Sequence, residues 1–115
     1  MQDLESIKQY LRKFAKDREW EQFHSPKNLA MALSVEAAEL VEIFQWLNPE
    51  QAANLNAKQQ AAAADEIADV LLYLVRIADR LDIDIAHAVT QKMRKNEQKY
   101  PADLVRGSAK KYSEY

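Results

Sequence analysis

The 115-residue sequence contains no cysteine, only one glycine and only three prolines, and each scarcity excludes a class of protein. Without cysteine, the chain has no disulfide framework, no thiolate metal site and no cysteine nucleophile. Glycine and proline, which build tight turns, are too rare for a fold made of many short strands. Alanine, leucine, glutamate, lysine and glutamine are abundant instead, and all of them favour helices. The composition therefore predicts an all-α fold.

The sequence also lacks a large excess of one charge and a long hydrophobic run. Its formal net charge is −2, which gives no electrostatic reason to bind nucleic acid or an anionic membrane surface. No apolar run approaches the roughly 18 residues that span a bilayer. The first ten residues, MQDLESIKQY, are too acidic for a signal peptide. We therefore expect a cytoplasmic protein with neither nucleic acid nor membrane as a partner.

Apolar residues at helical spacing predict four helices, over residues of about 2–18, 26–47, 59–81 and 85–99. Ser25-Pro26 indicates one helix start, with serine as the cap and proline in the first turn, and Asp84 is a second candidate cap. Asn48-Pro49 ends the second helix, because the residue before a proline disfavours helical geometry. Between the second and third helices, residues 49–58 predict a short helical turn and a loop.

The third helix contains DVLLYLV, which is apolar on every side, so we expect its middle to be buried on all faces. No linker or repeat interrupts the chain. We expect one domain over residues 1–101, followed by a tail, residues 102–115, that is mobile or packed on a neighbouring subunit.

A carboxylate lies within the apolar stripe of the second helix. That stripe consists of Leu29, Leu33, Leu40, Ile43 and Leu47. The position that should continue it is occupied by Glu36, and Glu39 follows one turn later on the same side. The third helix repeats the arrangement with Glu66 and Asp69, so each long helix presents two acids toward apolar surroundings.

Four carboxylates brought together repel one another, so the cluster requires protons or a cation. Because all the donors are oxygens, the site suits a hard ion, Mg²⁺ with Mn²⁺ as a substitute, and Mg²⁺ held in this way commonly binds phosphate substrates. A di-iron bundle would need glutamate-x-x-histidine on two helices. The two histidines, at positions 24 and 87, form no such motif. Other acids, such as Glu42, Glu50 and Asp65, are interpreted as solvated boundary residues.

These motifs resemble the all-α nucleoside triphosphate pyrophosphohydrolases, which include MazG, the dimeric dUTPases and the dCTP pyrophosphatases. The family pattern, glutamate-x-x-glutamate and then glutamate-x-x-aspartate, corresponds to Glu36-Ala-Ala-Glu39 and Glu66-Ile-Ala-Asp69. EWEQFHSPKNLAMAL, FQWL, DVLLYLV and KMRKNEQKYP look like the dCTP-pyrophosphatase branch, and the resemblance covers about residues 18–115. It implies a four-helix-bundle-like fold assembled as an oligomer, a homotetramer or otherwise a dimer.

The resemblance also implies a reaction. Such enzymes hydrolyse a nucleoside triphosphate to the monophosphate and pyrophosphate. Glu36, Glu39, Glu66 and Asp69 would coordinate Mg²⁺, which would bridge phosphate oxygens and activate water for attack on the α-phosphorus. Either Glu36 or Glu39 would orient or deprotonate that water. The expected role is cleaning the nucleotide pool, with a deoxynucleotide such as dCTP as substrate.

Residues for the rest of the nucleotide follow from the same resemblance. Lys92 and Asn96, on one face of the fourth helix, would contact phosphate or sugar, although a basic face that is merely solvated is the alternative. Trp20, His24 and Trp46 would enclose the base, although tryptophans are more often core residues. Tyr73 would bound the sugar and disfavour a ribose hydroxyl. The rival interpretation of the whole chain is a non-catalytic helical module that binds a nucleotide or a partner helix.

Overall fold

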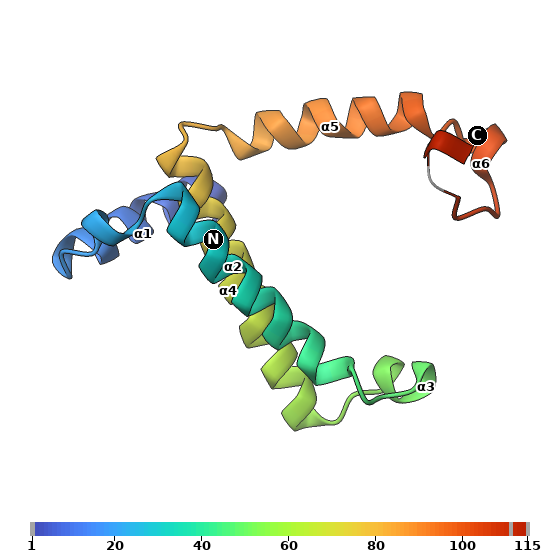
Figure 1. Ribbon diagram of the computed structural model, residues 1–115, viewed down its shortest axis with the longest axis horizontal. Helices are drawn as coiled ribbons and strands as arrows, with labels where there is room; N and C mark the ends of the chain where they lie inside the picture. Colours follow the sequence, from blue (N-terminus) through green and yellow to red (C-terminus); the bar gives the residue numbers. More distant parts are fainter. Residues whose placement is uncertain (1, 111, 115) are drawn as a thin grey trace. The chain divides into compact units, whose positions relative to one another are not determined.

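A computed structural model describes residues 2–110 and 112–114 of the chain. These residues form helices and no strand, which confirms the all-α prediction (Figure 1). The helices are α1 (Leu4–Asp17), η1 (Glu21–Phe23, a 3₁₀ turn), α2 (Pro26–Phe44), α3 (Pro49–Ala53), α4 (Ala57–Arg80), α5 (Ile85–Lys99), α6 (Ala102–Val105) and η2 (Tyr112–Glu114, also 3₁₀). The chain divides into two compact units, residues 1–83 and 84–115.

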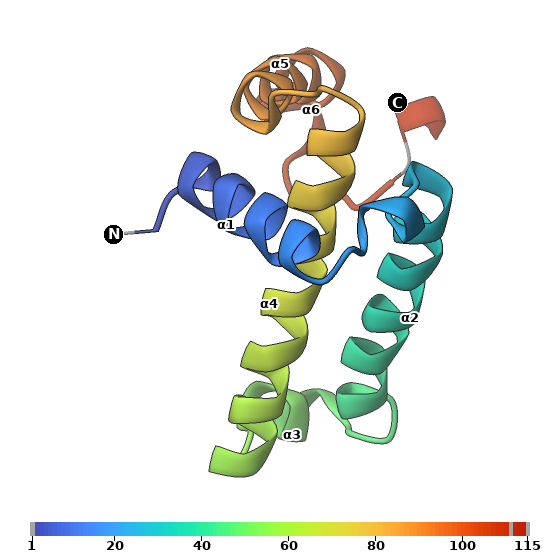
Figure 2. The same cartoon turned by 90° about the vertical axis from the view of Figure 1, so that its left-hand side faces the viewer.

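In the first unit, α2 and α4 run antiparallel side by side, and α1 packs across α4 (Figures 1 and 2). The short helix α3 lies in the connection between α2 and α4, at the end of the pair away from α1. The buried apolar residues come from all three long helices and are Ala15, Leu29, Ala63, Val75 and Ala78. The antiparallel pairing brings the middle of α2 beside the middle of α4, and these are the parts that carry the predicted acids.

Helix starts follow the sequence signals closely. The Ser25 side chain accepts a hydrogen bond from the backbone N–H of Asn28 at 3.1 Å, with Pro26 in the first turn of α2. Asp84 caps α5 by accepting from the backbone N–H of His87 at 3.0 Å. Each cap satisfies one of the amide groups that the first helical turn leaves unpaired. Both predicted helix starts are therefore confirmed.

The end of the second helix differs from the prediction. We predicted that the second helix continues to about Leu47, but α2 ends at Phe44 and the chain turns, with the N–H of Leu47 donating to the carbonyl of Phe44 at 2.9 Å. The reason is that Asn48 has to be extended, because it caps α3 and precedes Pro49. Residues 49–58 contain α3 and a loop, as predicted, and the third helix, α4, begins two residues early, at Ala57.

The expectation that DVLLYLV is buried on all faces is wrong for the single chain. Val75 is 2% exposed, but Leu71 and Leu74 are 41% and 43% exposed. Within the first unit, α4 has only α1 and α2 as extensive packing partners, so one of its faces is left uncovered. An apolar face of this kind on a single chain indicates a missing contact.

The second unit contains α5, α6 and η2. The tail, residues 102–115, which has no clear period, nevertheless forms α6 and, within the described residues, η2. Gly107, the single glycine, has φ +77°, a backbone conformation that glycine adopts without strain. The division into one domain over 1–101 and a tail stays a prediction. None of the helices that the structure describes combines the length and apolar character needed to cross a bilayer.

Candidate active site

Three of the four predicted metal ligands meet where α2 and α4 lie side by side. Glu36 and Glu39 come from α2, Glu66 comes from α4, and each offers a carboxylate oxygen within 4.8 Å of the other two. Glu39 and Glu66 also border a cleft of about 330 Å³, together with Glu42, Ile43 and Ala62. The cluster is therefore reachable by a small ligand.

Two oxygens of this cluster lack hydrogen-bond partners, although the carboxyl groups lie close enough to affect one another. Oε2 of Glu36 and Oε2 of Glu66 are buried, and neither has a hydrogen-bond partner among the described residues. The pKa of Glu36 is raised, chiefly by side-chain hydrogen bonding with Glu66 and then by burial, and the pKa of Glu39 is raised chiefly by Glu36. Buried polar atoms are normally satisfied. Two orphaned carboxylate oxygens in an all-oxygen donor set fit a hard divalent cation.

Asp69, the fourth predicted ligand, lies one turn beyond Glu66 on α4 and outside the group of three oxygens. Its charge still reaches the cluster, because it helps to raise the pKa of Glu36. Asp69 also lines a neighbouring pocket, as does Tyr73. The pKa of Tyr73 is raised, first by burial and then by the charges of Glu36, Asp69 and Glu39. Asp69 and Tyr73 therefore connect the acid cluster to this pocket.

The pocket is small and largely apolar, with a volume of about 170 Å³. Its walls come from α1, the α1–α2 connection, α2 and α4, and its lining residues are Leu11, Phe14, Trp20, His24, Leu29, Asp69, Leu72, Tyr73 and Arg76. Trp20 lies edge-on to the ring of Phe14, with centroids 5.8 Å apart, and to that of His24, with centroids 6.2 Å apart. Flat aromatic walls around a cavity of this size suit a planar heterocycle.

Three predicted substrate residues are not among the lining of this pocket, one in the first unit and two in the second. Trp46 is 87% exposed and follows the C-terminus of α2, whereas His24 precedes its N-terminus. A helix of 19 residues, the length of α2, is about 28 Å long, so these two side chains lie at opposite ends of it. Lys92 and Asn96 are exposed residues of α5, in the second unit. Their roles in substrate binding stay predictions.

Arg76 is the residue of this region that sequence reasoning missed. It is only 5% exposed, and its Nε–H donates to Nδ1 of His24 at 3.1 Å. The sequence contained a sign of this burial, because Arg76 follows directly after the apolar run DVLLYLV. It is a charged residue next to apolar ones, as Glu36 is in the stripe of α2. Buried arginines are rare unless they are paired.

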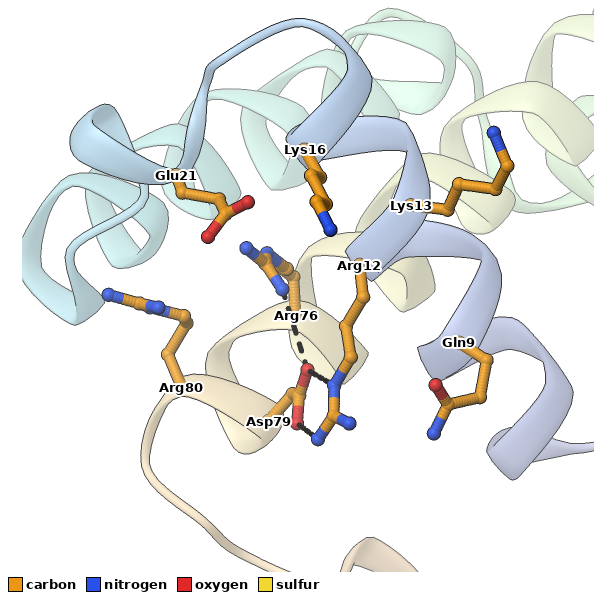
Figure 3. Close-up of a pocket in the computed structure, with 8 residues that line it drawn as sticks. All are labelled: Gln9, Arg12, Lys13, Lys16, Glu21, Arg76, Asp79 and Arg80. Carbon is orange, nitrogen blue, oxygen red and sulfur yellow. Dashed lines mark hydrogen bonds and ion pairs between the residues drawn. The ribbon is translucent and has the colours of Figure 1, made fainter.

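Arg76 also lines a second cleft, of about 550 Å³ (Figure 3). Its lining residues are Gln9, Arg12, Lys13, Lys16, Glu21, Arg76, Asp79 and Arg80. Most of its cations are already engaged. Arg12 binds Asp79 through two hydrogen bonds of 2.8 and 2.6 Å, Lys13 pairs with Asp17, and Arg80 donates to the backbone carbonyl of His24 at 3.1 Å. Among these cleft residues, Arg76 and Arg80 contact His24, so they help to hold one wall of the aromatic pocket.

Comparison with known proteins agrees with this geometry. The profile of the MazG-like family matches residues 31–115. Two curated proteins named dCTP pyrophosphatase 1, from Rattus norvegicus and Homo sapiens, are 45% and 43% identical over 113 residues, which is 96% of this chain. The chain spans 66% of the length of each of these relatives.

A solved structure gives a match of similar strength. The crystal structure of a pyrophosphatase from Archaeoglobus fulgidus superimposes with a TM-score of 0.82 at 41% identity, covering 88% of this chain and 94% of that one. Profile, relatives and structure agree over most of the sequence, including the segments that carry the acids. The chain therefore belongs to the MazG-like family.

Proposed function

We propose that this protein is a nucleoside triphosphate pyrophosphohydrolase that converts a deoxynucleotide such as dCTP to the monophosphate and pyrophosphate, and so cleans the nucleotide pool. The observation that carries the proposal is the position of the three clustered carboxylates, two with orphaned oxygens, next to an aromatic pocket of heterocycle size. The names of the relatives, dCTP pyrophosphatase and pyrophosphatase, support the same reaction.

Glu36, Glu39, Glu66 and Asp69 would hold Mg²⁺, and Mn²⁺ would substitute for it. When bound, this ion supplies positive charge to the phosphate oxygens and lowers the pKa of a coordinated water. Without a cation, the carboxylates lie unfavourably close to one another, and this raises the pKa of Glu36 and Glu39. A cation bound between them would turn this repulsion into attraction.

The chain's own residues would divide the remaining work between the cluster and the pocket. Glu39 or Glu36 accepts the proton of the attacking water, as a carboxylate close to the reacting phosphorus can. Trp20 and His24 bind the base, and Tyr73, which lies between pocket and acids, bounds the sugar. An aromatic ring against C2′ leaves no room for a ribose hydroxyl, which would favour deoxynucleotides.

The proposed enzyme is a homo-oligomer, a tetramer or otherwise a dimer. Its support is the exposed apolar face of α4, where Ile67, Leu71 and Leu74 are 58%, 41% and 43% exposed. Trp46, Lys92 and Asn96 would contribute to substrate binding in the assembled protein. We propose a cytoplasmic location, which is compatible with a nucleotide-cleaning role.

The test is an assay of each dNTP and NTP, with Mg²⁺ and without it, with the products resolved by ion-exchange chromatography. We expect monophosphate and pyrophosphate, with dCTP turned over faster than CTP. Glu39→Gln should lower the rate by at least about a hundredfold, a typical loss for a group that acts on charge or protons in the transition state. Glu42→Gln is the matched control, because Glu42 borders the same cleft outside the cluster. No turnover by the folded protein would favour the binding-module interpretation.

A further inference from the structure

The contact between Arg76 and His24 determines where the proton of the imidazole lies. The Nε–H of the guanidinium donates to Nδ1 of His24 at 3.1 Å, so Nδ1 has to be an unprotonated acceptor. A neutral imidazole carries one proton, which must then be on Nε2. In the part of the chain that the structure describes, no hydrogen bond uses Nε2, and the ring lines the aromatic pocket. Nε2–H is thus the polar group that His24 has available for an occupant.

The guanidinium of Arg76 is also held by Asp79, as Figure 3 shows. Nη1 of Arg76 lies 3.4 Å from Oδ2 of Asp79, and Asp79 is bound by two hydrogen bonds from Arg12 on α1. The side chains of Arg76 and Asp79 are 6% and 8% exposed. A buried arginine with a fixed carboxylate behind it has little freedom to turn away from His24. The chain of contacts runs from α1 through α4 to the pocket.

A second arginine fixes the backbone of the same residue. Nε of Arg80 donates to the carbonyl oxygen of His24 at 3.1 Å. Arg80 therefore positions the main chain of His24, whereas Arg76 alone contacts the ring nitrogen. This division of contacts supplies a matched pair of variants.

Burial and the charges of Arg76 and Arg80 disfavour the imidazolium form of His24. α4 contributes Arg76 and Arg80, together with Asp69 and Tyr73 at the pocket wall, and α1 and α2 contribute only apolar lining residues, Leu11, Phe14 and Leu29. The pKa of His24 is lowered, first by burial and then by the charges of Arg76 and Arg80. The neutral ring therefore persists through the neutral pH range.

We propose that Arg76 is a positioning residue for substrate binding: it holds His24 neutral, with Nε2–H directed to a hydrogen-bond acceptor on the edge of the base. The identity of the occupant as a nucleobase rests on the proposed function, but the protonation state of the ring does not. A neutral donor fixed by a buried cation can bind a ring nitrogen or a carbonyl oxygen on the edge of a base. It also keeps recognition independent of pH where a free histidine would titrate.

Nitrogen NMR of ¹⁵N-histidine-labelled protein tests the ring directly, without any substrate. The chain has only two histidines, and exposed His87 serves as the internal reference. In wild type we expect His24 with Nδ1 unprotonated, Nε2 protonated and a pKa below the ordinary 6.5. Arg76→Gln should raise that pKa toward 6.5 and mix the tautomers, whereas Arg80→Gln should keep Nε2–H dominant. A wild-type spectrum with the proton on Nδ1 would overturn the proposal, and this holds even if Arg76→Gln fails to fold.

Kinetics then test the link to the substrate. In wild type, the pH at which kcat/KM for dCTP begins to fall through protonation of His24 should lie below the ordinary 6.5, because the pKa of His24 is lowered. Arg76→Gln should lose about tenfold in kcat/KM, mostly through KM, as expected for one weakened hydrogen bond, and the fall of kcat/KM with acid should move to higher pH, toward 6.5. Arg76→Lys, which keeps a cationic donor, should recover part of the loss. Equal losses in Arg76→Gln and Arg80→Gln, with pH profiles that do not move from that of wild type, would assign Arg76 a purely structural role. An inactive wild type with the expected NMR spectrum would reject the proposed function alone.

Discussion

At the scale of single residues, the site depends on charged side chains in segments that are otherwise apolar. Glu36 interrupts the stripe of α2, and Arg76 follows the apolar run of α4. Neither position favours the stability of an isolated chain, because a carboxylate among carboxylates and a buried guanidinium both oppose folding. Side chains that reduce stability where they lie are typical of functional sites.

This view makes a prediction for Glu36→Gln. Because the substitution removes one charge from a cluster that lacks partners, the metal-free protein should become more stable, with a Tm higher by roughly 2–5 °C. The wild type should gain stability from Mg²⁺, by about 1.4 kcal/mol at ten times its dissociation constant, and the variant should lose most of that gain. Thermal unfolding followed by circular dichroism, with EDTA or with Mg²⁺, measures both effects.

The control for that experiment is Glu42→Gln, which removes a nearby charge outside the three clustered oxygens. It should leave the response to Mg²⁺ intact. If Glu36→Gln responds to Mg²⁺ as strongly as wild type does, the cluster is not the metal site.

At the scale of elements, α1 is joined to α4 by an ion pair between Arg12, which is half exposed, and Asp79, which is buried. Arg12 donates to both oxygens of Asp79, whose side chain is 8% exposed, and Asp79 also lies 3.4 Å from Arg76. The pair keeps α1 across the end of α4 where Leu11 and Phe14 close the aromatic pocket. The packing of α1 and the geometry of the site are therefore coupled.

Asp79→Asn should lower the free energy of unfolding by about 3 kcal/mol, since it leaves a buried guanidinium without its carboxylate. Asp17→Asn, which breaks the exposed pair with Lys13, should cost less than about 0.5 kcal/mol. Urea titrations of both variants measure the difference. A similar small cost in both variants would mean that the ion pairs of Asp79 with Arg12 and Arg76 contribute little to stability.

The same carboxylate predicts the response to acid. The pKa of Asp79 is lowered, chiefly by its hydrogen bond with Arg12, below the reference value of 3.8. Its ionised form is therefore favoured by folding, so its contribution is present above pH 3.8 and is lost as pH falls through the lower folded value. His24 also makes the protein less stable in acid, but at higher pH. Because its pKa is lowered by folding, the unfolded chain binds the proton more readily, so stability falls as pH drops below about 6.5.

At the scale of the whole molecule, the first unit has exposed apolar side chains on its two longest helices, α2 and α4. Ile67, Leu71 and Leu74 on α4 and Met31, Val35 and Val41 on α2 are all between 41% and 59% exposed. Ile67, Leu71 and Leu74 share one face of α4 by their spacing, and an apolar face of this kind is typical of a surface that associates. It is the physical support for the proposed oligomer.

Leu71→Asp should shift the protein toward a smaller assembly, because a buried unpaired carboxylate is costly at an interface. Size-exclusion chromatography with light scattering measures the assembly. Glu97→Asp, a change at an exposed residue of α5, is the control for handling and expression. If wild type is monomeric at the concentrations of the assay, the proposed oligomer is wrong.

Local signals carried much of the fold and of the acid cluster. Ser25-Pro26 and Asp84 identify helix starts because a cap depends only on neighbouring residues. Glu36, Glu39 and Glu66 could be found because their spacing violates an apolar pattern, and antiparallel packing of two helices then brings them together. The exposure of Leu71 and Leu74 could not be predicted, because it depends on which helices pack together in one chain.

The Arg76–His24 hydrogen bond was also beyond the sequence, since it joins residues 52 positions apart. The place of Trp46, at the other end of α2 from His24, likewise depends on the length and direction of that helix. Periodicity shows which residues share a face of one helix, but it does not show which faces meet.

The most direct test of the central proposal is hydrolysis of dCTP with Mg²⁺ in water enriched in ¹⁸O, followed by mass spectrometry of both products. Attack of water on the α-phosphorus, next to the carboxylates that accept its proton, predicts ¹⁸O in dCMP and unlabelled pyrophosphate. Label in pyrophosphate, or release of inorganic phosphate in its place, would contradict the proposed role of the cluster formed by Glu36, Glu39 and Glu66.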